Sequence, residues 1–341
     1  MLVNSKQAAD FMAIAMKAKH VTMLHGSPGC GKSDIVRDVA KQFKLSLIDI
    51  RLSQCDPVDL MGMPHFSIGS KRASYVPMDL FPLEDTPIPD GYNGFLVFLD
   101  EFNSSSMAVQ AAAYKVLLDK MVGQHALHPK TVMICAGNLA TDGAIVNRMS
   151  TATQSRLIHL ELSVDPEEWI KWASSNALDH RVISYIHGCP DSLHRFNPKH
   201  HDHTFSCPRT WAFASDICKV TGPNLREILP LLAGTVGEGE ANMFVAYTES
   251  TMRLPTIEQI RKNPEGALLD EDPAMLFAVA HMVAAYSKVS NIDVHMRYIN
   301  RMPMEFATVT LKNALKRDRT LITMDCVQDW ITKVGDEVFN D

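Results

Sequence analysis

The sequence has no paired cysteine motif and no long apolar run, and each absence disfavours particular classes of protein. Its seven cysteines are scattered without a single C-x-x-C pair, which disfavours a zinc ribbon or a disulfide framework and fits reduced thiols in a core. No stretch approaches the roughly 18 apolar residues of a membrane helix. The apolar residues between Met1 and His20 are periodic, unlike those of a signal peptide. We therefore expect a cytoplasmic protein that does not contact a membrane.

The chain also lacks an excess of positive charge. Lys and Arg number 33 against 39 Asp and Glu, which gives a formal net charge of −6, so no global basic field attracts nucleic acid. The 341 residues, 46% of them hydrophobic, exceed what one hydrophobic core usually serves. We expect a globular protein with two domains, or with one core and helical additions.

What the sequence does contain is a phosphate-loop motif. Residues 26–33 are GSPGCGKS and fit G-x-x-x-x-G-K-[ST] at every fixed position. A short apolar run from Val21 to Leu24 precedes the motif, and apolar residues at helical spacing follow it, which is the strand, loop and helix order that the motif requires. The predicted nucleotide-binding residues are Gly26, Ser27, Pro28, Gly29, Cys30, Gly31, Lys32 and Ser33.

Each residue type in this loop has a predicted task. The glycines let successive backbone N–H groups turn toward the phosphates at the N-terminus of the following helix. Lys32 is expected to reach the β- and γ-phosphates of ATP, and Ser33 to place its hydroxyl on Mg²⁺. Cys30 lies beside Lys32 at a variable motif position. It is either a redox-sensitive thiol or a tolerated small residue, and the second interpretation is favoured.

A second motif follows the first. Phe95 to Leu99 is a continuous apolar run that ends in Asp100 and Glu101, which is typical of a central parallel strand with two carboxylates at its C-terminal end. This is a Walker B sequence. We expect Asp100 to hold Mg²⁺ through water and Glu101 to polarise the attacking water. The alternative, two acids on a solvated turn, is disfavoured by the phosphate loop upstream.

Three more polar residues lie beside predicted strands and helices. Asn138 follows a buried strand at 131–136, which in a doubly wound sheet brings it within reach of the γ-phosphate; an asparagine selected for a tight turn is the alternative. Arg156 directly precedes the last predicted strand. Arg209 lies in the first turn of a helix that begins near Pro208. A cation there opposes the helix dipole, so an anionic partner is expected.

Breaker residues and histidines mark the remaining features. Residues 55–94 contain six prolines, too many for a long helix, and include a predicted hairpin around 69–72. Residues 121–131 predict a second hairpin, with Gly123 at its turn. Strand patterns end near Val164, and amphipathic helices follow. The histidines in the 194–203 loop fit no standard zinc spacing, so a solvated linker is favoured over a metal site.

Taken in order, these motifs resemble the AAA+ ATPases over roughly residues 1–235. The Pro-rich insertion with Asp59-Leu60-Met61-Gly62-Met63-Pro64, together with the hairpin just before Asn138, is similar to the helix-2 insert and pre-sensor-1 hairpin of the MoxR-like group with its AAA_5-type core. The resemblance implies an α/β fold. Its P-loop core, with a five-stranded parallel sheet, would cover residues 1–163, with inserted hairpins at 55–94 and 121–131. An all-helical lid at 164–235 and a C-terminal helical extension at 236–341 would follow.

The resemblance also implies roles for single residues. Asn138 is similar to sensor 1 and Arg209 to sensor 2 in the lid. Arg156 is similar to the arginine finger that acts on the ATP of the neighbouring subunit, with Arg148 as an imperfect rival. Such proteins form rings, usually hexameric, with ATP at the subunit interfaces, and often act beside a partner that bears a von Willebrand A domain.

We therefore expect an ATPase that remodels or matures a protein client in a chaperone-like manner. A nucleic-acid-acting motor is one alternative, and a scaffold that uses ATP only to assemble is another. The hairpin tips at 69–72 and 125–130 are weakly basic and contain no Phe, Tyr or Trp as a platform for base stacking. This favours a protein client over nucleic acid.

Overall fold

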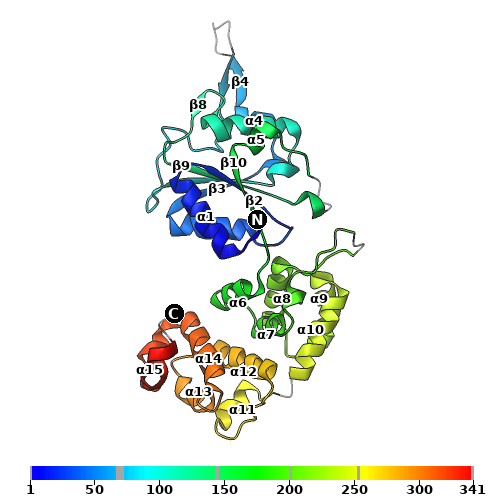
Figure 1. Cartoon of the computed structure of the whole chain (residues 1–341), viewed down its shortest axis with the longest axis vertical. Coiled ribbons are helices and arrows are strands. Elements are labelled where there is room, and N and C mark those ends of the chain that lie inside the picture. Colours follow the sequence, from blue (N-terminus) through cyan, green and yellow to red (C-terminus); the bar gives the residue numbers. More distant parts are fainter. Residues whose placement is uncertain (1, 67–72, 143–145, 200–201, 252–253, 339–341) are drawn as a thin grey trace. The chain divides into compact units, whose positions relative to one another are not determined.

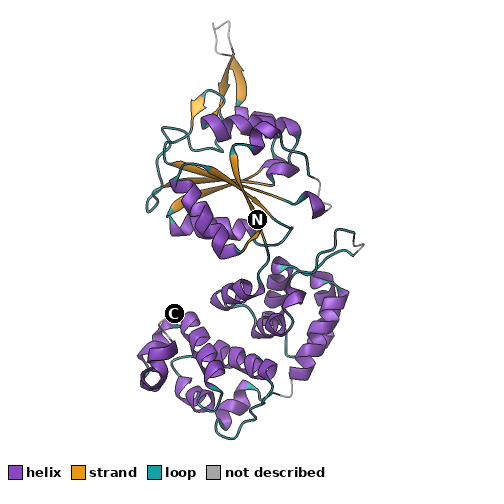
Figure 2. Ribbon diagram, in the orientation of Figure 1, coloured by secondary structure: helices purple, strands orange, loops and turns teal. Residues whose placement is uncertain are grey.

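The computed structural model describes residues 2–66, 73–142, 146–199, 202–251 and 254–338, and it divides into two units. The first comprises Met1–Asp165 with the short segment Asn197–His200, and the second comprises Pro166–Phe196 and His201–Asp341. The first unit contains a sheet with helices on both faces, and the second is built of helices (Figures 1 and 2). The division of the helical part into a lid and an extension is not tested by these units and stays a prediction.

The first unit is built on a parallel sheet of six strands. In spatial order these are β1 (Leu2–Val3), β10 (Leu157–Leu162), β2 (Val21–His25), β9 (Thr131–Gly137), β6 (Gly94–Asp100) and β3 (Leu45–Arg51). The predicted parallel α/β core is confirmed, and the sheet has one strand more than the five that the resemblance implies. The addition is β1, which pairs with β10 through Leu2 and Val3. Two residues are too few to leave a periodic signal in the sequence.

Helices cover both faces of this sheet because successive strand side chains point to opposite sides. On one side, Met23 and Val97 pack in a core with α4 (Met107–Asp119). On the other, Leu24 and Phe98 pack with α1 (Ser5–Lys17) and α2 (Lys32–Gln42). A strand that is buried on both faces must be apolar throughout, which explains the continuous run before Asp100.

Short elements connect the strands of the sheet. They are η1 (Leu52–Gln54), α3 (Pro57–Met61), β4 (Met63–Phe66), β5 (Ala73–Val76), η2 (Phe102–Ser104), β7 (Met121–Val122), β8 (His125–Ala126), η3 (Ala140–Asp142) and α5 (Thr151–Gln154). The strand pairs β4–β5 and β7–β8 are the two expected hairpins. The predicted turn at 69–72 lies outside the described residues.

The two hairpins contact each other. At Gly123, whose φ is 59°, an added Cβ would lie 2.3 Å from the carbonyl oxygen of Met61, at the end of α3 just before β4, and 3.5 Å from Cβ of Tyr75 in β5. His125 donates from Nε2 to the carbonyl oxygen of Tyr75 at 3.2 Å. The β4–β5 ribbon projects beyond α4 (Figure 1), and the β7–β8 hairpin supports its base.

The second unit consists of a succession of mostly short helices. They are α6 (Pro166–Ser175), α7 (His180–Gly188), η4 (Pro190–Leu193), α8 (Pro208–Val220), η5 (Leu225–Ile228), α9 (Leu229–Val236), α10 (Glu238–Thr251), α11 (Ile257–Lys262), α12 (Pro273–Tyr286), α13 (Ile292–Ile299), α14 (Met304–Arg317), η6 (Arg319–Thr323) and α15 (Asp325–Val338). Tyr185, Trp211 and Phe244 pack against one another from α7, α8 and α10, with ring centroids 5.3–5.5 Å apart. Among the described residues, no helix combines the length and the apolar character needed to cross a bilayer.

Candidate nucleotide site

The predicted phosphate loop joins β2 to α2. Gly29 and Gly31 have φ angles of 76° and 92°, left-handed conformations that glycine adopts without strain. At Gly26 an added Cβ would lie 2.9 Å from Sγ of Cys30 and 3.3 Å from Cβ of Leu162 in β10, so the neighbouring side chains leave little room for one here. A curled backbone that leads into a helix N-terminus fits the phosphates of a nucleotide.

Lys32 lies inside this curl. Its side chain is buried, and Nζ donates to the carbonyl oxygens of Gly26 at 2.7 Å and Ser27 at 3.1 Å and to Oδ1 of Asn138 at 3.2 Å. All three acceptors are neutral, and no carboxylate among the described residues forms a salt bridge with the ammonium. Because a buried charge without a counter-ion is costly, this arrangement fits an anionic ligand.

Ser33 and Asp100 form a second part of the site. The hydroxyl of Ser33, in the first turn of α2, donates to Oδ2 of Asp100 at 3.0 Å. Asp100 is the last residue of β6. A hydroxyl and one carboxylate suit Mg²⁺, which typically takes one or two protein oxygens and completes its shell with phosphate oxygens and water. The described residues contain no group of three or more His, Cys, Asp or Glu side chains placed to hold a metal by themselves.

Glu101 follows in a strained conformation. Its φ is 55°, unusual for a residue with a side chain, and its N–H donates to Oδ1 of Asp100 at 2.8 Å. Its carboxylate accepts a hydrogen bond from the hydroxyl of Ser53 in η1. Ser53 was not among the predicted residues. The available signal was its position two residues after β3, which the fold places next to β6.

Asn138 lies where the sequence predicted it, at the end of β9 between β2 and β6. Its backbone is fixed by the buried Asn103, which accepts from the Asn138 N–H at 3.1 Å and donates to the Asn138 carbonyl oxygen at 2.8 Å. At Gly137 an added Cβ would lie 2.3 Å from Oδ1 of Asn103. Asn103 thus holds the sensor candidate in position, and the sequence analysis did not identify it.

Arg156 lies away from these groups. It precedes β10, whose first residue, Leu157, pairs with Val21 at the start of β2, whereas the phosphate loop follows the end of β2. Along a strand of this length the two ends are about 13 Å apart. Its guanidinium donates to the carbonyl oxygen of Ala152 at 2.8 Å and lies over the ring of Tyr114. Both Arg156 and Arg148 are exposed.

Two predicted features lie wholly or partly in the second unit. Arg209 is exposed in the first turn of α8, which begins at Pro208 as expected. Its role as sensor 2 stays a prediction. In the His-rich loop, residues 200 and 201 lie outside the described residues, so the choice between linker and metal site also stays open.

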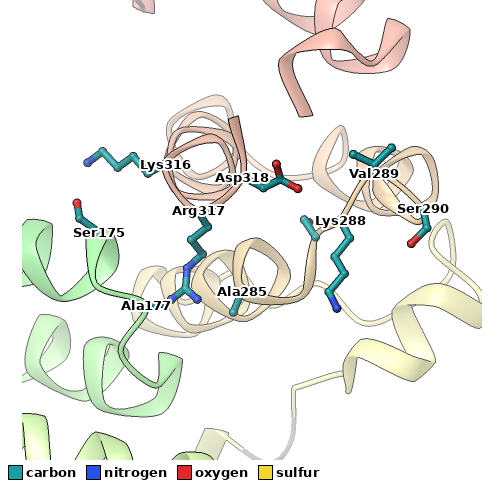
Figure 3. Close-up of a pocket in the computed structure, with 10 residues that line it drawn as sticks. Ser175, Ala177, Ala285, Lys288, Val289, Ser290, Lys316, Arg317 and Asp318 are labelled. Carbon is teal, nitrogen blue, oxygen red and sulfur yellow. The ribbon is translucent and has the colours of Figure 1, made fainter. Parts of the chain in front are cut away.

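The second unit contains a cavity of about 650 Å³. Cationic side chains at its wall include Lys288, Lys316 and Arg317, and Arg317 donates to the carbonyl oxygen of Leu178 at 3.1 Å. Burial lowers the pKa of the Arg317 guanidinium. Lys316 points away from the other two, so the three charges do not converge on one point (Figure 3). None of the predicted site residues lines this cavity.

Comparison with known families agrees with the nucleotide site. Residues 22–157 match the model of the ATPase family associated with various cellular activities (AAA). The match contains the phosphate loop and also Asp100, Glu101, Asn138 and Arg156. Residues 22–157 of the chain are therefore similar to AAA-family domains. A search of curated proteins found no match.

Solved structures show only distant similarity. A point mutant of Thermotoga maritima RuvB is 15% identical, with 76% of this chain and 75% of that chain covered and a TM-score of 0.40. A protein of Cytophaga hutchinsonii described as a proposed ATPase is 16% identical, with 98% and 89% covered and a TM-score of 0.38. The Thermotoga maritima RuvB Holliday junction branch migration motor is 16% identical, with 76% and 72% covered and a TM-score of 0.37. Similarity at this level does not contribute to the functional assignment.

Proposed function

We propose that the AAA-family domain binds and hydrolyses ATP with Mg²⁺, within a ring-forming, MoxR-like motor that remodels or matures a protein client. The observation that carries the proposal is the meeting of Lys32, Ser33, Asp100 and Asn138 at the carboxyl ends of three adjacent strands. Ligands of open parallel sheets bind at this edge.

The residues divide the chemistry among them. The backbone of residues 26–33 and the Lys32 ammonium would hold the phosphates, and Ser33 with Asp100 would hold Mg²⁺, which supplies charge neutralisation at the phosphates. Glu101 is the candidate base for the attacking water, and Asn138 would orient groups beside the γ-phosphate. The sensor 2 role of Arg209 is part of the same proposal.

The position of Arg156 supports a ring. At the opposite end of the strands it cannot reach the phosphate loop of its own chain, yet it is exposed and therefore available to a neighbour. An arginine that stabilises the transferring phosphoryl group in trans fits this placement. The proposal includes a hexameric ring, as in most MoxR-like proteins. It also includes a partner with a von Willebrand A domain.

The hairpins support a protein client. Met63 and Val76 are exposed on one face of the β4–β5 ribbon, and Phe66 and Tyr75 on the other, and exposed large apolar side chains on a projecting element mark protein contacts. The described residues of the ribbon include no Lys or Arg, so they carry no fixed positive charge for the phosphates of nucleic acid.

The hairpins are also connected to the site through short segments. Ser53, which binds Glu101, is followed after a few residues by α3 and the ribbon. The second hairpin leads directly into β9 and Asn138. A movement of the catalytic carboxylate can therefore be transmitted through these short segments to the proposed client-binding surface.

The test is ATP hydrolysis by wild type and by Glu101→Gln, followed by capture of proteins on the full-length chain. We expect Glu101→Gln to bind ATP normally and to hydrolyse it about 10²–10⁴-fold more slowly, since it keeps the shape and loses the base. It should retain a client only with ATP present, and an added Phe66→Asp should abolish retention. If the wild-type protein hydrolyses no ATP, either alone or with its captured partners, the scaffold alternative replaces the motor proposal.

A further inference from the structure

Two histidines on neighbouring strands are hydrogen-bonded between the phosphate loop and α5. His25 is the last residue of β2 and directly precedes Gly26. His159 lies on β10, the strand beside β2. Nε2 of His25 lies 2.9 Å from Nδ1 of His159, and neither residue has a role in the function proposed above.

The chemistry of the partners fixes the direction of these hydrogen bonds. Nε2 of His159 lies 2.9 Å from the carbonyl oxygen of Gln154, which only accepts. His159 therefore donates from Nε2 and, when neutral, accepts at Nδ1, so that His25 is the donor between the rings. Burial, and then the neighbouring charges of His159 and Lys32, lower the pKa of His25 to about 4, so His25 is neutral at physiological pH.

One end of this series of hydrogen bonds lies next to the phosphate loop. Gly26, next to His25, accepts from Nζ of Lys32 through its carbonyl oxygen at 2.7 Å. Its N–H donates to the carbonyl oxygen of Gly137 at 3.2 Å. A shift of Lys32 or of the loop backbone therefore acts directly on the position of His25.

The other end is anchored in the segment that carries both finger candidates. Gln154 ends α5, two residues before Arg156, and Arg156 itself donates to Ala152 in that helix. The side-chain amide of Gln154 donates to the carbonyl oxygen of Met149 at 3.0 Å, the residue after Arg148. Backbone pairing between β10 and β2 begins only at Leu157. The hydrogen bond from His159 therefore fixes Gln154, a residue that has no backbone pairing in the sheet.

We propose that His25 and His159 are positioning residues that connect the segment 149–156 to the phosphate loop, so that the state of one ATP site sets the placement of the arginine offered to the next subunit. This inference rests on the proposed function, since it requires hydrolysis assisted by an arginine in trans. The two histidines connect the phosphate loop, at one end of β2, with the segment 149–156, at the other end of this strand.

A double-mutant cycle on the full-length protein tests the coupling. Single-turnover hydrolysis is measured for wild type, His159→Ala, Arg156→Ala and the double variant, together with ATP affinity and thermal unfolding. We expect His159→Ala to slow hydrolysis roughly 10- to 100-fold, as small displacements of a positioned group do, while ATP affinity changes less than about twofold. In the Arg156→Ala background the same change should have no further effect, because residues that act through one another are not additive. His20→Ala, an exposed histidine just before β2, is the matched control and should equal wild type.

Several results would overturn the inference. The first is that His159→Ala hydrolyses ATP at the wild-type rate. The second is that the two substitutions together slow hydrolysis by the product of their separate effects. The third is that His159→Ala loses as much ATP affinity as hydrolysis rate. If His159→Ala unfolds, His25→Asn replaces it in the same cycle. The proposed function is judged separately: if Arg156→Ala alone hydrolyses at the wild-type rate, Arg156 is not the finger and the cycle is repeated with Arg148→Ala. If neither arginine matters, the finger in trans is lost, and the inference is lost with it.

Discussion

The ammonium nitrogen of Lys32 lies 3.2 Å from the amide oxygen of Asn138, a residue 106 positions later in the chain. The sheet brings the two together, because β2 and β9 are adjacent and their register pairs His25 with Gly137. The first residues beyond both strands therefore emerge side by side. A motif lysine and a polar residue at the next strand end thus form one site, although no sequence pattern links them.

Lys32→Ala should lose most of the nucleotide affinity. Interactions with a charged group contribute about 1.5–3 kcal/mol, and more where the surroundings are dry, so we expect ATP to bind at least about 10- to 100-fold more weakly by calorimetric titration. Lys41→Ala, an exposed lysine on the same helix, is the control and should bind as wild type does. Unchanged affinity in Lys32→Ala would refute the assignment of the loop.

The sequence could predict those site residues whose position follows from strand order alone. Lys32, Asp100 and Asn138 each follow or end an apolar run, and the ends of parallel strands meet at one edge. Ser53 and Asn103 could not be found in this way, since their roles depend on which strand lies beside β6 and on a buried turn after Glu101. The pairing of His25 with His159 depends likewise on β10 lying next to β2. The strand β1 was missed because two residues show no period.

Ser53→Ala should raise the basal rate of hydrolysis. Ser53 lies in η1, just after β3 and on the side of β6 remote from Lys32 and Asn138, so we expect its hydrogen bond to hold the Glu101 carboxylate away from the loop. Without this bond the carboxylate is free to turn toward the site. We expect kcat to increase several-fold, up to about tenfold for a net gain of 1–1.5 kcal/mol.

Ser53→Thr is the matched control for this change, because it keeps the hydroxyl and should retain the wild-type rate. A fall of kcat in Ser53→Ala with unchanged ATP affinity would show the reverse, that Ser53 orients Glu101 for catalysis.

Gly123→Ala should separate the two hairpins. The added Cβ would approach the Met61 carbonyl oxygen to 2.3 Å at a φ of 59°, so both steric overlap and backbone strain oppose it. Strain alone costs about 1–3 kcal/mol. We expect faster amide hydrogen exchange at β4 and β7 and weaker client retention, while ATP affinity stays unchanged.

Gly91→Ala is the control for left-handed strain without a steric contact, since its φ is 84° and nothing lies within 4 Å of an added Cβ. It should leave exchange at β4 and β7 as in wild type. Equal exchange in Gly123→Ala and wild type would show that the hairpins do not depend on this contact.

Arg156→Ala and Lys32→Ala subunits should complement each other when mixed. Each variant alone lacks one half of every interface and should be nearly inactive, because a finger in trans is worth about 10³-fold or more in rate. In a mixed ring, some interfaces pair the intact loop of an Arg156→Ala subunit with the intact arginine of a Lys32→Ala subunit. Those interfaces should hydrolyse ATP, so the mixture should exceed the activity of either variant.

The measurement is phosphate release as a function of mixing ratio, with subunit exchange followed by a fluorescent label. A finger acting within its own chain predicts no gain at any ratio, and the strand register argues against that case because Arg156 and the loop lie at opposite ends of β2. A ring that needs every site active would also show no gain, and titration of Arg156→Ala into wild type separates the two. Such a ring loses activity faster than the fraction of variant added, whereas independent chains lose it in proportion. If Arg156→Ala alone assembles and hydrolyses ATP at the wild-type rate, the finger must be sought at Arg148.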